Sequence, residues 1–128
     1  NEICRLYKKE NPNIDSKNIL SIITPFAAQA STIYKYLKTQ LGQLANDITV
    51  GTVHTFQGAE RNIIIFSTVY GKNEDGFFID NNRNLMNVAV SRAKDAFWVF
   101  GDIEFLKSKS SDTASGLLYE KVSGNSIE

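Results

Sequence analysis

One arginine stands on the apolar side of a predicted helix. Leu85–Ala93 is mostly apolar and typical of a buried helix, and Ala96–Phe100 is typical of a buried strand. At about 100° per residue, Arg92 shares the helix arc of Leu85 and Val88. Its guanidinium stays charged and presents a rigid fork that suits phosphate groups. Alternatively, the side chain bends past the helix end to cap carbonyl groups there, and the spacing leaves both options open.

Polar residues directly follow two other apolar stretches. Ile19–Ile23 and Ile48–Val53 are predicted strands, and they lead into Thr24–Gln29 and His54–Glu60. Ligands gather at the carboxyl ends of parallel strands. We therefore expect these two segments and the neighbourhood of Arg92 to share the functional edge of one sheet.

Periodicity and turn residues predict the elements that position these side chains. Thr24 and Pro25 match the N-cap and first position of a helix that Gly42 ends. The stretch NIIIFSTV is apolar on both faces and predicts a central parallel strand. The other predicted segments are a short helix at Glu2–Glu10, a loop or exposed hairpin at 71–82, a short helix at 102–109 and a last helical turn or two at 116–122.

Alternating strands and helices predict an α/β fold with a mainly parallel sheet flanked by helices. We expect one domain over residues 1–128, with its core at about 19–105 and a mobile polar stretch at 108–116. Phe26, Phe97 and Trp98 are expected in the core, because they adjoin or lie within apolar strands.

Composition narrows the functional classes. The net charge is zero. Residues 1–45 contain six Lys or Arg against three Asp or Glu, and residues 46–128 contain eight against eleven. This is not the charge balance of a strongly basic nucleic-acid-binding module. Cys4 and His54 are the only cysteine and histidine, so we expect no disulfide and no metal site of the Cys/His type.

The expected location is the cytoplasm, where thiols stay reduced. No apolar run approaches the roughly 20 residues of a membrane span, and the start shows no signal-peptide pattern. We expect no membrane partner. The chain lacks an initiator Met, which is typical of a fragment.

The chain lacks the parts for nucleotide hydrolysis on its own, because it has no G-x-x-x-x-G-K-[ST] phosphate loop and no paired carboxylates for Mg²⁺. It does contain, in order, ITPFAAQ (23–29), VGTVHTFQGAERNIIIFS (50–67) and NLMNVAVSRAKDAFWVFGD (84–102). These stretches resemble motifs IV, V and VI of superfamily I helicases. The closest likeness is to the branch of the nonsense-mediated-decay helicase and its DNA helicase relatives.

The resemblance implies the second, C-terminal RecA-like domain of an ATP-dependent motor. The N-terminal RecA-like domain, absent here, would hold the phosphate loop and most contacts to ATP and Mg²⁺, so we expect this chain to be inactive alone. Arg92 matches the motif VI arginine finger that reaches the γ-phosphate. Glu60 matches the motif V glutamate that bonds the ribose or a neighbouring arginine, and the alternative is an exposed turn residue.

Four more residues are assigned to the nucleotide cleft by the same resemblance. Gly58 would provide a positive φ or a close backbone approach. Gln57 would hydrogen-bond across the cleft. Gln29 would reach the cleft or brace its loop, and Lys94 would contact a phosphate or remain solvated.

Thr24 and Pro25 of motif IV, with Thr52, His54 and Thr55 of motif V, are expected to face single-stranded nucleic acid. Hydroxyls and backbone amides there hold phosphates without reading sequence. DNA is favoured over RNA because DNA helicases are numerous among the relatives. His54 has a structural alternative, since a lone histidine is more often a structural hydrogen-bonding residue than a ligand-binding one. Several relatives carry an acidic residue at that position, so its assignment departs from the family pattern.

Two rival interpretations remain. The domain could be a non-catalytic RecA-like scaffold or nucleic-acid adaptor, although Arg92 and Glu60 are both in place. An unrelated α/β nucleotide-binding enzyme would need a complete site within these residues, and we find none.

Overall fold

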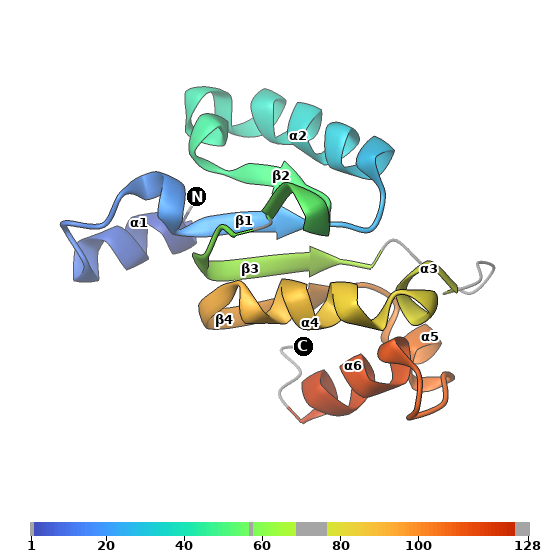
Figure 1. Ribbon diagram of the computed structural model, residues 1–128. Helices are drawn as coiled ribbons and strands as arrows, with labels where there is room; N and C mark the ends of the chain where they lie inside the picture. The colour runs from blue at the N-terminus through green and yellow to red at the C-terminus, as the bar shows by residue number, and fades with distance from the viewer. Residues whose placement is uncertain (1, 57, 69–76, 125–128) are drawn as a thin grey trace.

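A parallel sheet with helices on both faces forms the protein (Figure 1). The structure is a computed structural model that describes residues 2–56, 58–68 and 77–124. The elements in chain order are α1 (Glu2–Glu10), η1 (Ser16–Asn18), β1 (Leu20–Ile23), α2 (Ala27–Leu41), η2 (Gly42–Asp47), β2 (Thr49–Gly51), η3 (Val53–Phe56), β3 (Arg61–Ser67), α3 (Phe77–Asn81), α4 (Arg83–Ser91), β4 (Ala93–Phe100), α5 (Ile103–Lys107) and α6 (Ala114–Ser123). The predicted α/β fold is confirmed.

The strands lie in the order β2-β1-β3-β4, and all neighbouring pairs are parallel. Ile22 pairs with Val50 on one side and with Ile65 on the other, so β1 is flanked by strands on both sides. Ile64 of β3 pairs with Phe97 of β4. Residues 62–67 of the stretch NIIIFSTV therefore lie in a central strand, as its apolar character predicts, while residue 69 lies outside the described part.

Each face of the sheet has its own apolar core. On one face, Phe66 of β3 is 1% exposed and packs with Met86 and Ala89 of α4, and its ring lies 6.1 Å from that of Phe97. The helices α5 and α6 add to this core, and Figure 1 shows them below α4 in the view. On the other face, Ile63 packs in a second cluster with side chains of α1 and α2. Both layers fix the strand ends that carry the site.

Tertiary contacts override the local signals in one region. The loop prediction is wrong for Phe77–Asn81, which is helical, while residues 69–76 lie outside the described part. Ile79 is 2% exposed, and the Asp80 carboxylate accepts a 2.8 Å hydrogen bond from the Ser115 amide of α6. These contacts stabilise a short helix that the polar composition does not favour. The mobility of residues 108–116 stays a prediction.

The junction between α4 and β4 also differs from its prediction. Ala93 was expected in the helix, but it begins β4 and pairs with Arg61, with a register shift before Ile63. The cause is a backbone hydrogen bond of 2.9 Å from the Arg61 amide to the Arg92 carbonyl. The ladder therefore starts directly after Arg92, the cap residue of the helix.

Gly42 ends α2 with a φ of 58° and ψ of −124°, a conformation that L side chains rarely adopt. We expect Gly42→Ala to lower the free energy of unfolding by about 1–3 kcal/mol from this backbone strain. Gly124 is the matched control, because it follows α6 with a φ of −78° and open space around an added Cβ. Denaturant unfolding measures both variants. Equal stability of the two would contradict the prediction.

Candidate functional site

The predicted site residues lie on two opposite edges of the sheet. Thr24 follows β1 and Thr52 follows β2, so both lie at the carboxyl edge. Glu60 and Arg92 directly precede β3 and β4, which puts them at the amino edge. The expectation that all these residues share the carboxyl edge is wrong. The expectation fails because Glu60 and Arg92 come directly before a strand, whereas Thr24 and Thr52 come directly after one.

Arg92 is the cap residue at the C-terminal end of α4. Its backbone amide donates to the Ala89 carbonyl over 3.2 Å, and its own carbonyl accepts from Arg61. The residue is half-buried, and its buried Nε has no hydrogen-bond partner in the ranges 2–56, 58–68 and 77–124. Among the residues that the structure describes, no carbonyl accepts a hydrogen bond from this side chain, so the capping alternative has no support here. The guanidinium is left with hydrogen-bonding capacity at the amino edge.

Glu60 and Lys94 form an ion pair at the same edge. The Lys94 Nζ lies 3.3 Å from the Glu60 Oε2, and both side chains are more than half exposed. Because Arg61 pairs with Ala93, the residues just before them, Glu60 and Arg92, come to the ends of neighbouring strands. An exposed pair of this kind contributes only about 0–1 kcal/mol to stability. The structure thus brings together three residues of the expected nucleotide cleft.

Arg61 is a neighbour that the sequence reasoning missed. Its guanidinium donates to the Glu60 carbonyl over 2.8 Å and contacts the Thr49 hydroxyl at 3.5 Å. Its buried Nε has no partner among the described residues. Its amide bonds Arg92, as described above. The available signal was a basic residue placed directly between a polar turn and an apolar strand. Two half-buried arginines therefore mark the amino ends of β3 and β4.

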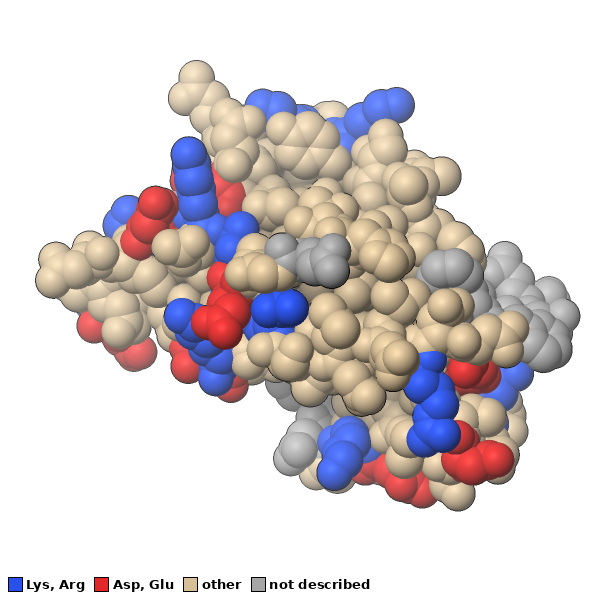
Figure 2. All heavy atoms as spheres, viewed as in Figure 1, with Lys and Arg blue, Asp and Glu red and all other residues tan. Residues whose placement is uncertain are grey.

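Charged side chains of both signs gather at this edge on the visible face. Figure 2 shows blue and red spheres at the left, where Figure 1 has the amino ends of the strands and α1, whereas uncharged residues cover most of the middle of the face. Such a mixed cluster can bind an anion through its arginines and lysine while its carboxylate accepts hydrogen bonds.

The other three residues of the expected nucleotide cleft have different outcomes. Gly58 has a φ of 81°, which confirms its positive φ. An added Cβ would meet no atom of the described residues within 4 Å. Gln57 lies outside the described residues. Gln29 lies in the first turn of α2, at the carboxyl edge, and is not brought together with Glu60.

The carboxyl edge begins with a buried polar residue. Thr24 is 0% exposed, and its amide donates to the Gly51 carbonyl over 3.1 Å. Its Oγ1 has no hydrogen-bond partner in the described part of the chain. The predicted helix start at Thr24 is therefore wrong, because Thr24 is still held by the sheet and α2 begins at Ala27. Phe26 is the N-cap, without a side-chain cap bond, and it is exposed rather than in the core. The amides of this helix start can therefore receive an anion.

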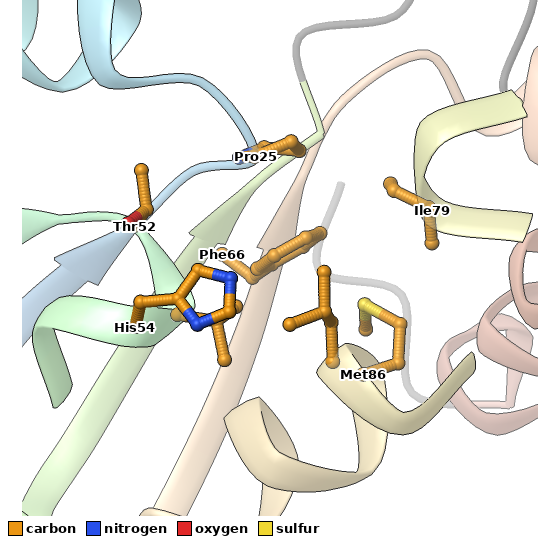
Figure 3. Close-up of a pocket in the computed structure, with 8 residues that line it drawn as sticks. Pro25, Thr52, His54, Phe66, Ile79 and Met86 are labelled. Atoms are coloured by element: carbon orange, nitrogen blue, oxygen red, sulfur yellow. The ribbon is translucent and has the colours of Figure 1, made fainter. Parts of the chain in front are cut away.

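A small cavity lies between this edge and α4. Figure 3 shows His54, Phe66 and Met86 converging on it, with Pro25 and Thr52 at one side. Its volume is about 20 Å³, which is room for about one water molecule. His54 itself is exposed, and its ring has no hydrogen bond within the described residues. The cavity is too small for a nucleobase, although its rim carries three residues of the expected nucleic-acid surface.

The described residues show neither a metal-binding cluster nor a membrane-spanning helix. In the ranges 2–56, 58–68 and 77–124, no three His, Cys, Asp or Glu side chains come close enough to hold a metal ion. No helix among these residues is long and apolar enough to cross a membrane.

Comparisons with known proteins agree with this geometry. The family model described as AAA domain matches residues 1–104. Helicase sen1 of Schizosaccharomyces pombe is 34% identical over 100 residues, which are 76% of this chain and 6% of that protein. The DNA polymerase alpha-associated DNA helicase A of Saccharomyces cerevisiae is 37% identical over 71% of this chain and 13% of its own length. The Regulator of nonsense transcripts 1 homolog of Drosophila melanogaster is 32% identical over 68% of this chain and 8% of its own length. The chain thus spans a small part of each relative.

Proposed function

The chain belongs to the AAA domain family and is a superfamily I helicase domain of the Sen1 and Upf1 type, and we propose that it is the C-terminal RecA-like motor domain of a larger ATP-dependent helicase. In this proposal residues 1–128 form one domain. The N-terminal RecA-like domain of the same protein supplies the phosphate loop and most of the contacts to ATP and Mg²⁺. The 128 residues alone do not hydrolyse ATP.

Arg92 carries the proposal. Its charged side chain is half-buried at the amino edge, and its Nε has no partner among the residues that the structure describes. Charged groups are almost never buried without a partner, so the position supports a partner on another surface, the γ-phosphate held by the first domain. The Arg92 guanidinium would donate hydrogen bonds to the oxygens of that phosphoryl group and stabilise the charge that it carries in the transition state.

Glu60 and Lys94 complete the nucleotide side. The Glu60 carboxylate would accept hydrogen bonds from the ribose hydroxyls, and the ammonium group of Lys94 would hold this carboxylate in place, as their 3.3 Å contact supports. Arg61 would position Arg92 through the shared backbone hydrogen bond. Mg²⁺ would reduce the negative charge of the bound phosphates, and the ion would be held by the first domain.

We expect Glu60→Gln to raise the KM for ATP about tenfold or more, because a hydrogen bond to a charged group is worth about 1.5–3 kcal/mol. The same variant should change the free energy of unfolding by less than about 1 kcal/mol, since the pair with Lys94 is exposed. Steady-state ATP hydrolysis by the full-length protein measures the KM. Glu120→Gln on α6 is the control, because Glu120 is exposed and outside the site. An unchanged KM in Glu60→Gln would leave Glu60 as a turn residue only.

The carboxyl edge would bind the single strand. The backbone amides in the first turn of α2 support phosphate binding there, and Thr52, His54 and Thr55 line the same edge. Pro25 is buried and would shape the turn before α2. Because the nucleotide residues lie at the opposite edge, closing of the cleft against the first domain would move the strand-binding edge once per ATP.

The full-length protein tests this function directly. We expect single-stranded nucleic acid to stimulate its ATP hydrolysis, with DNA favoured over RNA as the stimulating strand. Parallel reactions with DNA, with RNA and without a strand give the comparison. Hydrolysis that no strand stimulates would reject the motor function and favour the scaffold alternative.

A further inference from the structure

An open groove lies between the N-terminal half of α2 and the segment formed by β2 and η3, and it is distinct from the cavity of Figure 3. Its volume is about 330 Å³, against about 20 Å³ for that cavity. Ala30, Val50 and Gly51 lie along it, and the exposed ring of Tyr34 stands at its side. A space of this size is at the lower end of the roughly 300–1,000 Å³ of small-molecule sites.

Small residues create the groove. Gly51 ends β2, and a Cβ added there would lie 2.6 Å from the Thr55 hydroxyl, so only glycine lets η3 fold back this closely over the strand. Ala30 presents a short side chain from α2 and is 7% exposed. The groove between them therefore follows from the local sequence and does not need a distorted backbone.

The chemistry of the lining suits an uncharged group as the occupant. None of the eight described residues that line the groove is charged. The hydroxyls of Ser31, Thr52 and Thr55 have no hydrogen-bond partner within the described residues, and each can donate and accept. An aromatic ring beside uncharged hydroxyls suits a flat, uncharged group with polar edges.

We infer that this groove holds one nucleobase of the bound single strand, stacked on Tyr34 with its polar edge toward the hydroxyls. The inference rests on the proposed function, and the position of the groove supports the inference. Thr52 lines both the groove and the phosphate-binding carboxyl edge, so a strand that crosses that edge can turn one base inward. Because hydroxyls both donate and accept, the groove would take any of the bases.

Tyr34→Ala in the full-length protein tests the inference. We expect it to weaken binding of a single-stranded oligonucleotide about tenfold, as loss of one stacked base does, while Tyr34→Phe keeps the wild-type affinity. Tyr36→Ala is the matched control, because Tyr36 lies on the same helix, is 65% exposed and does not line the groove. Fluorescence anisotropy measures each affinity.

Oligonucleotides with one abasic nucleotide, moved along the strand, identify the base. In the wild-type protein we expect a loss of affinity at one position, and in Tyr34→Ala that loss should disappear. The inference is overturned if Tyr34→Ala binds like the wild type, or if the abasic penalty persists in the variant. Both results leave strand binding itself intact. A wild-type protein that binds no single strand would instead overturn the proposed function, and the inference with it.

Discussion

Arg92→Ala in the full-length protein is expected to reduce strand-stimulated ATP hydrolysis by roughly 10³–10⁵-fold, the range that arginine fingers contribute. Binding of ATP should remain largely intact, because most contacts would come from the first domain. The physical reason is the position of the side chain, which is half-buried at the amino edge with an Nε that no described group of its own chain satisfies. Turnover measured at saturating ATP, together with equilibrium ATP binding, separates the two effects.

Arg83→Ala is the matched control for this experiment. Arg83 begins the same helix and is exposed, and it lies nine residues, or roughly 13 Å, from Arg92 along the axis. It should keep wild-type turnover. If Arg92→Ala also hydrolyses ATP at the wild-type rate, the residue has no role in the transition state.

The second large effect is on stability. We expect Phe66→Ala to lower the free energy of unfolding by about 3–5 kcal/mol, because it removes a buried ring and leaves a cavity in the core below α4. Phe66 is 1% exposed and stacks with Phe97. Phe100→Ala on the neighbouring strand should cost about 1 kcal/mol or less, since Phe100 is 59% exposed. Chemical denaturation of both variants gives the comparison, and equal losses would show that the core assignment is wrong.

Periodicity predicted the elements whose own residues carry the signal. The apolar run in β3 and the apolar spacing of α2 with Gly42 at its end reappear in the structure. Phe97 and Trp98 pack against the cores as expected, because they lie inside a strand that pairs along its length. In these cases the local pattern and the tertiary contacts favour the same structure.

Connections between elements were harder to predict. Phe26 adjoins a strand but is exposed, because the chain leaves the sheet after Thr24 and begins a helix. Glu60 and Arg92 lie at the amino edge because each directly precedes its strand. The rule that ligands gather at the carboxyl ends of parallel strands assigned them to the opposite edge. The short helix Phe77–Asn81 depends on contacts with α6, which lies far away in the sequence.

The motifs predicted only in part which of the assigned residues come together in space. They assigned Arg92, Glu60 and Lys94 to the nucleotide, and the structure brings these three to one edge. Gln29 was given the same assignment but begins α2 at the opposite edge. No sequence motif predicts the groove beside Tyr34. It arises where a helix and a turn that are separate in sequence present small side chains to each other.

The central claim is that Arg92 completes an ATP site across a domain interface. A crystal structure of the full-length protein with ADP and aluminium fluoride, which imitates the phosphoryl group in transfer, tests it most directly. We expect a guanidinium nitrogen of Arg92 to lie roughly 3 Å from a fluoride, at hydrogen-bonding distance. A structure in which Arg92 turns to its own helix, and no residue of this chain contacts the fluoride, would contradict the claim.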